Sequence, residues 1–409
     1  MNVMRYSFVA AIAMGGQLVA LGLAFLFHFI MARLLGVALY GDFGVLLATF
    51  TILLFPIISV QAVMMREVAK LHRENKEENI RWLILRYLKI GLLFGSFLAL
   101  LAFIVLFSLG ILIQPLETVL ILLSVPLFYA IYIFNSYFQG KQQPFHFVTV
   151  LILMDLLRFI LAVALVWGGL NLLGVATSYV LGSFLLFLPL LLFFYFKQHP
   201  SARPFSFSLA QHLVWVFPTY AFLSFFLVAD LFFVRHLLTT ETAGLYNAAL
   251  TLARGIFYAG VGLMNAFLPQ SSKLDIRKDT KKLFRSLVIS VMLLLSFALI
   301  VFAFKDLLIG VLYGSAYLES FPLLGVLVFS MFFLSLSLLF TNLMWSQHEQ
   351  RIPFFISLIT VLVSLPIFYI LTVVWGAIGA AYASLVSTFL FALLSGSATW
   401  VILNRSRRP

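Results

Sequence analysis

The sequence contains no cysteine and little charge, and these two shortages exclude several classes of protein. Of its 409 residues, 10% are charged and 63% are hydrophobic, whereas about a quarter of the residues in soluble domains are charged. A water-soluble globule is therefore excluded. Without cysteine, the chain can form no disulfide, no thiolate metal site and no cysteine nucleophile.

The sequence instead has twelve apolar stretches, each long enough to cross a bilayer as a helix of about 20 residues. Strands of a membrane barrel alternate apolar and polar residues, but a stretch such as LLFGSFLALLAFIVLFSLGILI is apolar on every side. The sequence therefore predicts an all-α polytopic membrane protein with twelve transmembrane helices. The predicted spans are residues 6–32, 43–65, 83–109, 116–138, 147–168, 172–196, 212–238, 244–270, 285–304, 320–345, 354–374 and 376–402.

The positions of Lys and Arg indicate the orientation of these spans, because cytoplasmic loops hold the excess of positive charge. With a cytoplasmic N-terminus, only Arg33, Arg235 and Lys305 of the 26 basic residues fall in outer loops. Arg158 and Arg254 lie inside spans. We therefore expect a multi-pass protein of the plasma membrane with both termini in the cytoplasm. The net charge of +12 reflects this topology and does not indicate nucleic-acid binding.

The second half of the chain resembles the first. QGKQQPF from Gln139 matches QHEQRIPF from Gln347, and the other matching segments recur at a nearly constant offset. We expect two pseudo-symmetric six-helix lobes, residues 1–205 and 206–409. Because six spans are an even number, both lobes have the same orientation, as in the parallel repeats of transporters.

Five motifs follow one another along the chain. They are ARLLGVALYGDFGVL, SVQAVMMREVAK, LVADLFFVRHLLTTETAGLYNAALTLA, LIGVLYGSAYLES and WGAIGAAYASLVS. In this order they resemble the oligosaccharide flippases of the multidrug/oligosaccharidyl-lipid/polysaccharide exporter superfamily, and the resemblance covers essentially the whole chain. It implies a central V-shaped cavity between the lobes and alternating access. It also implies a cargo of oligosaccharide linked to a polyprenyl phosphate or pyrophosphate, moved from the cytoplasmic to the outer leaflet.

One predicted helix has a polar face near the middle of the membrane. Asn247, Thr251, Arg254, Tyr258 and Asn265 recur at helical spacing. An ionisable residue inside a span usually faces a cavity or a partner, and arginine offers a bidentate fork to phosphate. This face is therefore a candidate substrate-binding surface, with contacts between helices inside one lobe as the alternative.

Four further ionisable residues lie inside spans. Asp155 and Arg158 are three residues apart on one face, so they neutralise each other or present Arg158 as a second cationic contact for cargo. In superfamily members a carboxylate on the helix of residues 212–238 is often tied to cation or proton coupling, and the resemblance implies this role for Asp230, with an Asp230–Arg235 bridge as the alternative. Asp155 and His28 are the next candidates for ion coupling. His28 could relay protons or have a packing role.

Three other functions were weighed against the flippase. A multidrug exporter shares the fold, but its cationic substrates favour an acidic or aromatic cavity. Peptidoglycan-precursor flippases generally have two more helices after the twelfth, whereas this sequence ends at Pro409. A membrane glycosyltransferase or polymerase needs acidic residues on a large outer loop.

The sequence has none of the motifs HExxH, GxSxG or a P-loop. We expect a protein that is not an enzyme and has no cofactor or metal. Its coupling ion, if any, is H⁺ or Na⁺. It is expected to act as a monomer alongside glycan-assembly enzymes, with lipid-linked oligosaccharide and membrane lipid as its partners.

Overall fold

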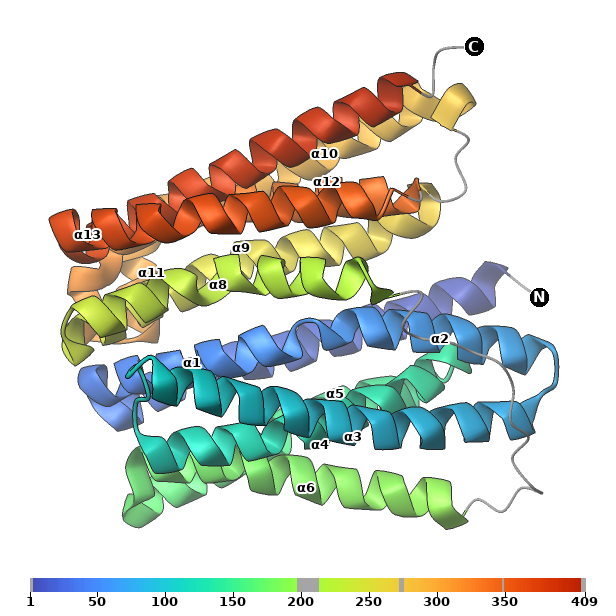
Figure 1. Cartoon of the computed structure of the whole chain (residues 1–409), viewed down its shortest axis with the longest axis horizontal. Coiled ribbons are helices and arrows are strands. Elements are labelled where there is room, and N and C mark those ends of the chain that lie inside the picture. Colours follow the sequence, from blue (N-terminus) through green and yellow to red (C-terminus); the bar gives the residue numbers. More distant parts are fainter. Residues whose placement is uncertain (1–2, 197–212, 272–275, 348, 406–409) are drawn as a thin grey trace. The chain divides into compact units, whose positions relative to one another are not determined.

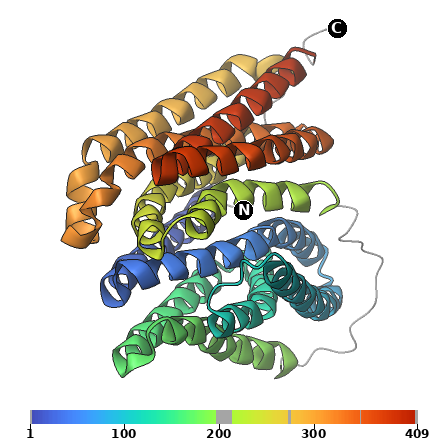
Figure 2. The same ribbon diagram turned by 60° about the vertical axis from the view of Figure 1, so that its left-hand side comes forward.

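A computed structural model describes residues 3–196, 213–271, 276–347 and 349–405, and all regular secondary structure in these ranges is helical. Figures 1 and 2 show this part of the chain as coiled ribbons joined by short connections. The predicted all-α fold is confirmed. The helices are α1 Val3–Leu54, α2 Ile57–Arg73, α3 Glu77–Ser108, α4 Pro115–Gly140, α5 Pro144–Leu165, η1 Val166–Leu170, α6 Asn171–Phe196, α8 Val216–Leu237, α9 Thr240–Ser271, α10 Ile276–Ala303, α11 Lys305–Leu312, η2 Ser315–Ser320, α12 Phe321–Ser346 and α13 Arg351–Arg405.

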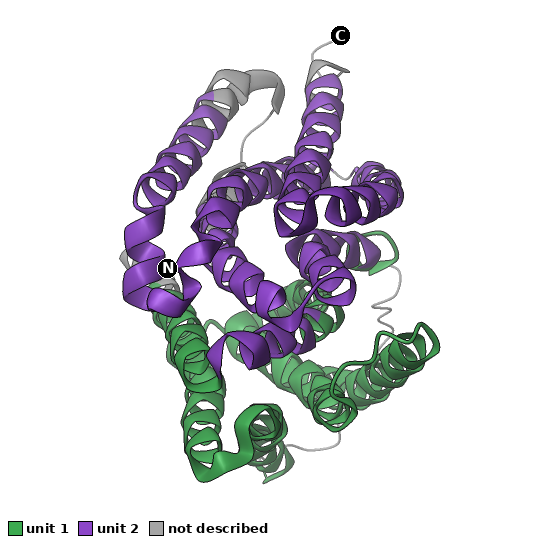
Figure 3. Cartoon of the chain, turned by 90° about the vertical axis from the view of Figure 1, so that its left-hand side faces the viewer, with its two compact units in different colours: residues 1–35, 49–217 green, residues 36–48, 218–409 purple. Residues whose placement is uncertain are grey.

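The chain forms two compact units, coloured separately in Figure 3. Unit 1 comprises Met1–Leu35 and Thr49–Phe217, and unit 2 comprises Gly36–Ala48 and Pro218–Pro409. The predicted lobe boundary after residue 205 lies outside the described residues. One short stretch of the first half, residues 36–48, packs with unit 2.

Single glycines interrupt the longest helices. Gly36 in α1, Gly169 in η1 and Gly376 in α13 have φ values of 74°, 88° and 62°, which residues with a Cβ atom rarely adopt. A straight helix of the 52 residues of α1 would reach about 78 Å, more than twice the roughly 30 Å of hydrocarbon in a bilayer. The interruptions therefore let each long helix supply two spans.

The predicted breaks near residues 36, 169 and 376 are thereby confirmed. The chain also leaves the helix at Phe55 and Pro56, inside the predicted span 43–65. Seven described helices are long and apolar enough to cross a membrane, or eight if the bent pair α10 and α11 forms one span. The count of twelve stays a prediction.

The fourth predicted span of each half is the central helix of its unit. In unit 1, α4 packs against α2, α3 and α6, and in unit 2, α12 packs against α9, α10 and α13. Small residues allow these approaches, since Gly95 of α3 faces Pro126 of α4 and Gly260 of α9 faces Ser335 of α12. The two units thus repeat one packing arrangement, in agreement with the internal duplication.

Candidate functional site

Unit 2 contains a buried cluster around Asp230 of α8. Asp230 is buried, with only 1% of its surface exposed. Its Oδ2 accepts a hydrogen bond of 2.9 Å from the Tyr246 hydroxyl, and its Oδ1 accepts one of 2.9 Å from the Leu231 backbone N–H. The α8–α9 turn brings Tyr246 to this point, and the Thr239 hydroxyl caps the turn by accepting from the Thr242 N–H at 3.2 Å.

Arg254 belongs to the same cluster. It is 9% exposed, and its Nε donates a hydrogen bond of 3.0 Å to the Leu227 carbonyl oxygen of α8. Its guanidinium acts electrostatically on the Asp230 carboxylate, as does the hydroxyl of Ser384 from α13. The structure therefore brings together two residues predicted separately from the sequence, a candidate coupling carboxylate and a candidate cargo-binding cation.

Three residues on one face of α9 have buried polar atoms that lack a hydrogen-bond partner. These atoms are Asn247 Oδ1, Thr251 Oγ1 and Arg254 Nη2. The other amide atom of Asn247, Nδ2, donates to the Tyr40 carbonyl oxygen at 3.1 Å. Tyr258 lies further along the helix and is half-buried. The side chain of the fifth predicted residue, Asn265, lies outside the described part of the structure.

Three tyrosines pack beside this face, and the sequence analysis did not include them in the site. Tyr40, Tyr313 and Tyr317 have ring centroids 5.4–6.0 Å apart, and the Tyr40 and Tyr313 hydroxyl oxygens are 3.5 Å apart. A signal was present in the sequence. The pair Leu-Tyr followed by Gly or Asn occurs at Tyr40, Tyr246 and Tyr313, and all three tyrosines are buried in unit 2.

Arg235 does not bridge to Asp230. Its Nε pairs with Asp42 Oδ1 at 2.6 Å, and both side chains belong to unit 2. The Asp230–Arg235 bridge considered from the sequence is therefore wrong, because the spacing of five residues places the two side chains on different faces of α8. Arg235 instead ties residues 36–48 to α8.

Unit 1 has its own half-buried ion pair on α5. Asp155 Oδ1 accepts from Arg158 Nη2 at 2.7 Å, as the spacing of three predicts. The Arg158 guanidinium also lies over two rings, 5.0 Å from the Phe27 centroid and 4.7 Å from that of Tyr179. His28 is half-buried, with its ring edge against Phe27. The pair thus neutralises both charges inside unit 1.

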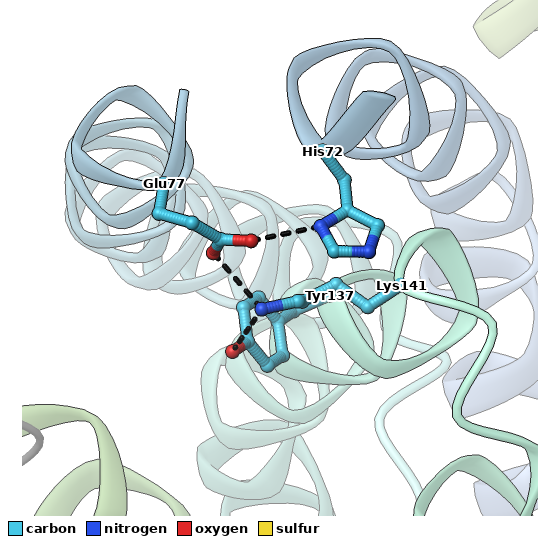
Figure 4. Close-up of polar contacts among 4 residues, drawn as sticks. All are labelled: His72, Glu77, Tyr137 and Lys141. Carbon is cyan, nitrogen blue, oxygen red and sulfur yellow. Dashed lines mark hydrogen bonds and ion pairs between the residues drawn. The ribbon is translucent and has the colours of Figure 1, made fainter. Parts of the chain in front are cut away.

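A polar network joins the α2–α3 turn of unit 1 to the end of α4 (Figure 4). Glu77 Oε1 lies 2.8 Å from His72 Nδ1, and Glu77 Oε2 accepts from Lys141 Nζ at 2.9 Å. Lys141 also lies over the Tyr137 ring, 5.2 Å from its centroid. Burial lowers the pKa of Lys141, but the Glu77 carboxylate outweighs it and holds the pKa above its ordinary value.

The described residues contain no group of three or more His, Cys, Asp or Glu side chains that could hold a metal ion. The cluster around Asp230 and Arg254 instead presents ionisable side chains and hydrogen-bonding groups. Such a site can bind an anion or exchange a proton or small cation.

A family model described as polysaccharide biosynthesis protein matches residues 10–275 of the chain. A comparison with curated protein sequences finds no significant match.

The fold is similar to that of solved transporters. An inward-facing multidrug resistance MATE family transporter of the MOP superfamily is 13% identical, with a TM-score of 0.77 over 94% of this chain and 95% of the other. An outward-facing one is 13% identical, with a TM-score of 0.70 over 98% and 96%. A MOP superfamily transporter from Pyrococcus furiosus is 16% identical, with a TM-score of 0.63 over 99% and 96%. At these identities the likeness establishes the fold.

Proposed function

The chain belongs to the polysaccharide biosynthesis protein family, and we propose that it is a flippase for lipid-linked oligosaccharide. The cargo is an oligosaccharide on a polyprenyl phosphate or pyrophosphate, moved from the cytoplasmic to the outer leaflet. The family match over residues 10–275 is the observation that carries this proposal. The fold is one found in both inward-facing and outward-facing conformations, which supports transport by alternating access.

Arg254 is the proposed contact for the cargo's phosphate. Its Nη2 has no hydrogen-bond partner, and an arginine fork can donate two parallel hydrogen bonds to phosphate oxygens. Arg158 is a weaker second contact, because Asp155 already neutralises it. Tyr258 and Asn265, on the same face of α9, stay candidate contacts for sugar hydroxyls.

Asp230 is the proposed site of ion coupling. A ligand shifts a two-state equilibrium only through different affinities for the two states. A buried carboxylate whose exposure changes between states meets that requirement. Asp155 is less suited, because Arg158 neutralises it in a direct pair. His28 is a half-buried residue of unit 1 whose ring packs against Phe27. We further propose a plasma-membrane location, cytoplasmic termini and action as a monomer beside glycan-assembly enzymes.

A multidrug exporter is the second candidate, since two of the transporters with similar folds are described as multidrug resistance proteins. Competition separates the two functions. Purified protein in liposomes would be offered a fluorescent cationic drug and a lipid-linked oligosaccharide together. The flippase proposal expects oligosaccharide to appear in the outer leaflet with no drug transport. The flippase proposal would be refuted if the drug were transported, if the oligosaccharide did not inhibit that transport, and if no oligosaccharide moved.

A further inference from the structure

The groups around Asp230 donate hydrogen bonds or are positively charged. From α9, the Tyr246 hydroxyl donates to Asp230 Oδ2, and the Arg254 guanidinium lies within electrostatic reach. From α8 itself, the Leu231 N–H donates to Oδ1. From α13, the Ser384 hydroxyl lies nearby and is 2.8 Å from the Ser330 hydroxyl.

Such a setting suits a proton and not a sodium ion. A hard metal cation needs a shell of oxygen atoms that accept its charge. At Asp230 both carboxylate oxygens already accept from donors, and the neighbouring Arg254 guanidinium has no lone pair to offer a metal ion. A proton needs only one carboxylate oxygen and adds no coordination shell.

A row of polar atoms on α9 connects this carboxylate with the tyrosine cluster. Arg254 acts electrostatically on both Asp230 and Tyr40. The Thr251 hydroxyl lies near the hydroxyls of Tyr40 and Tyr313, but its geometry forms no direct hydrogen bond with either. Asn247 Oδ1, one turn nearer the start of α9, also has no partner.

Buried polar atoms are nearly always hydrogen-bonded to protein or to ordered water, and a water molecule bridges polar groups that are too far apart to bond directly. Three such atoms on one helix face, beside two hydroxyls, supply the polar partners that a short chain of water molecules needs. The row runs toward the start of α9 at Thr240, about 10 Å from Asn247 at 1.5 Å per residue, at the end predicted to face outward.

We propose that the coupling ion is a proton, and that it passes between Asp230 and the outer side through water held by Arg254, Thr251 and Asn247. The inference rests on the proposed function, since it names the ion that acts at the coupling carboxylate. It also gives Thr251 and Asn247 a role in proton passage in place of the predicted contact with cargo.

Thr251→Val tests the water row, because valine keeps the shape of threonine and removes the hydroxyl. Thr360→Val is the matched control, since Thr360 of α13 is also buried but donates to its own helix at Ile356 O, 2.7 Å away. Both variants and the wild type would be placed in sodium-free liposomes containing a pH-sensitive dye. The measured quantity is the ratio of flipping with a proton gradient to flipping without one. We expect Thr251→Val to lower this ratio about tenfold and the control to match the wild type. An unchanged ratio in Thr251→Val would refute the proposal that protons pass along this row of polar atoms.

Sodium is tested separately, without transport. A cation that binds the folded protein raises its melting temperature by mass action. We expect equal melting temperatures in matched NaCl and KCl for the wild type and for Asp230→Asn. Stabilisation by sodium that Asp230→Asn abolishes would overturn the proton assignment even if no cargo were flipped. Absence of flipping under every condition would instead refute the proposed function.

Discussion

Arg254 makes one hydrogen bond with its guanidinium and keeps a second nitrogen unpartnered. Arg254→Lys retains the charge but loses the planar fork, so we expect flipping to fall strongly, and Arg254→Ala should nearly abolish it. Outer-leaflet appearance of cargo in liposomes measures the effect, and gel filtration checks that each variant is folded. Flipping at the wild-type rate by folded Arg254→Ala would remove Arg254 from the cargo site.

A substitution of Asp230 tests whether this residue couples transport to an ion gradient. Asp230→Asn mimics the protonated carboxyl group and cannot exchange a proton, so its flipping should no longer respond to an imposed ion gradient. The comparison is the rate of cargo movement with and without the gradient, in the wild type and the variant. A variant that still follows the gradient as the wild type does would place coupling elsewhere.

Residue contacts within one helix could be predicted from the sequence, and those between helices could not. The spacing of three that pairs Asp155 with Arg158 and the shared face of Asn247, Thr251 and Arg254 follow from helical periodicity. The pairing of Arg235 with Asp42, 193 residues apart, depends on how residues 36–48 pack, and periodicity contains no information about that.

At the scale of elements, Gly36 kinks α1. Its backbone, with φ 74° and ψ 172°, lies in a region that is essentially restricted to glycine. Gly36→Ala should therefore destabilise the protein by roughly 1–3 kcal/mol, seen as a lower melting temperature. Gly22→Ala is the control, because Gly22 lies inside the same helix with open space around it. Equal melting temperatures for the two variants would contradict this account of the kink.

The contact between the α2–α3 turn and α4 gives a pH-dependent prediction. Lys141→Met removes the ion pair with Glu77 and should cost about 1 kcal/mol or less, whereas Lys70→Met on the exposed face should change little. Because folding raises the pKa of Lys141, its stabilisation is fully present below the ordinary value of 10.5 and is lost as pH rises through the higher value. Melting temperatures of the wild type and Lys141→Met should differ at neutral pH and converge above pH 10.5. A constant difference would exclude the pair as its cause.

Helices were predictable from apolar length, but the form of their breaks was not. The sequence predicts a loop between residues 32 and 43, whereas the structure has a kink at a single glycine, Gly36. One residue without a Cβ atom is enough for the kink at Gly36, so the sequence needs no polar or proline-rich segment at this position.

For the whole molecule, the repeated halves and the distribution of basic residues predict one orientation. Single cysteines can test it, because the natural chain has none. Glu74→Cys, in the α2–α3 turn, should be protected from a membrane-impermeant thiol reagent applied to intact cells, and Leu109→Cys, after α3, should react. Labelling of Glu74→Cys alone would mean that the orientation is inverted.

The central claim is that the molecule moves lipid-linked oligosaccharide between leaflets. The most direct measurement uses purified protein in sealed liposomes with cargo in both leaflets and a glycan-cleaving reagent outside. Without flipping, only the outer half of the cargo is cleaved. We predict that cleavage continues beyond half with the wild-type protein and stops there with Arg254→Ala. Cleavage that stops at half with the folded wild-type protein, under every imposed gradient, would contradict the account.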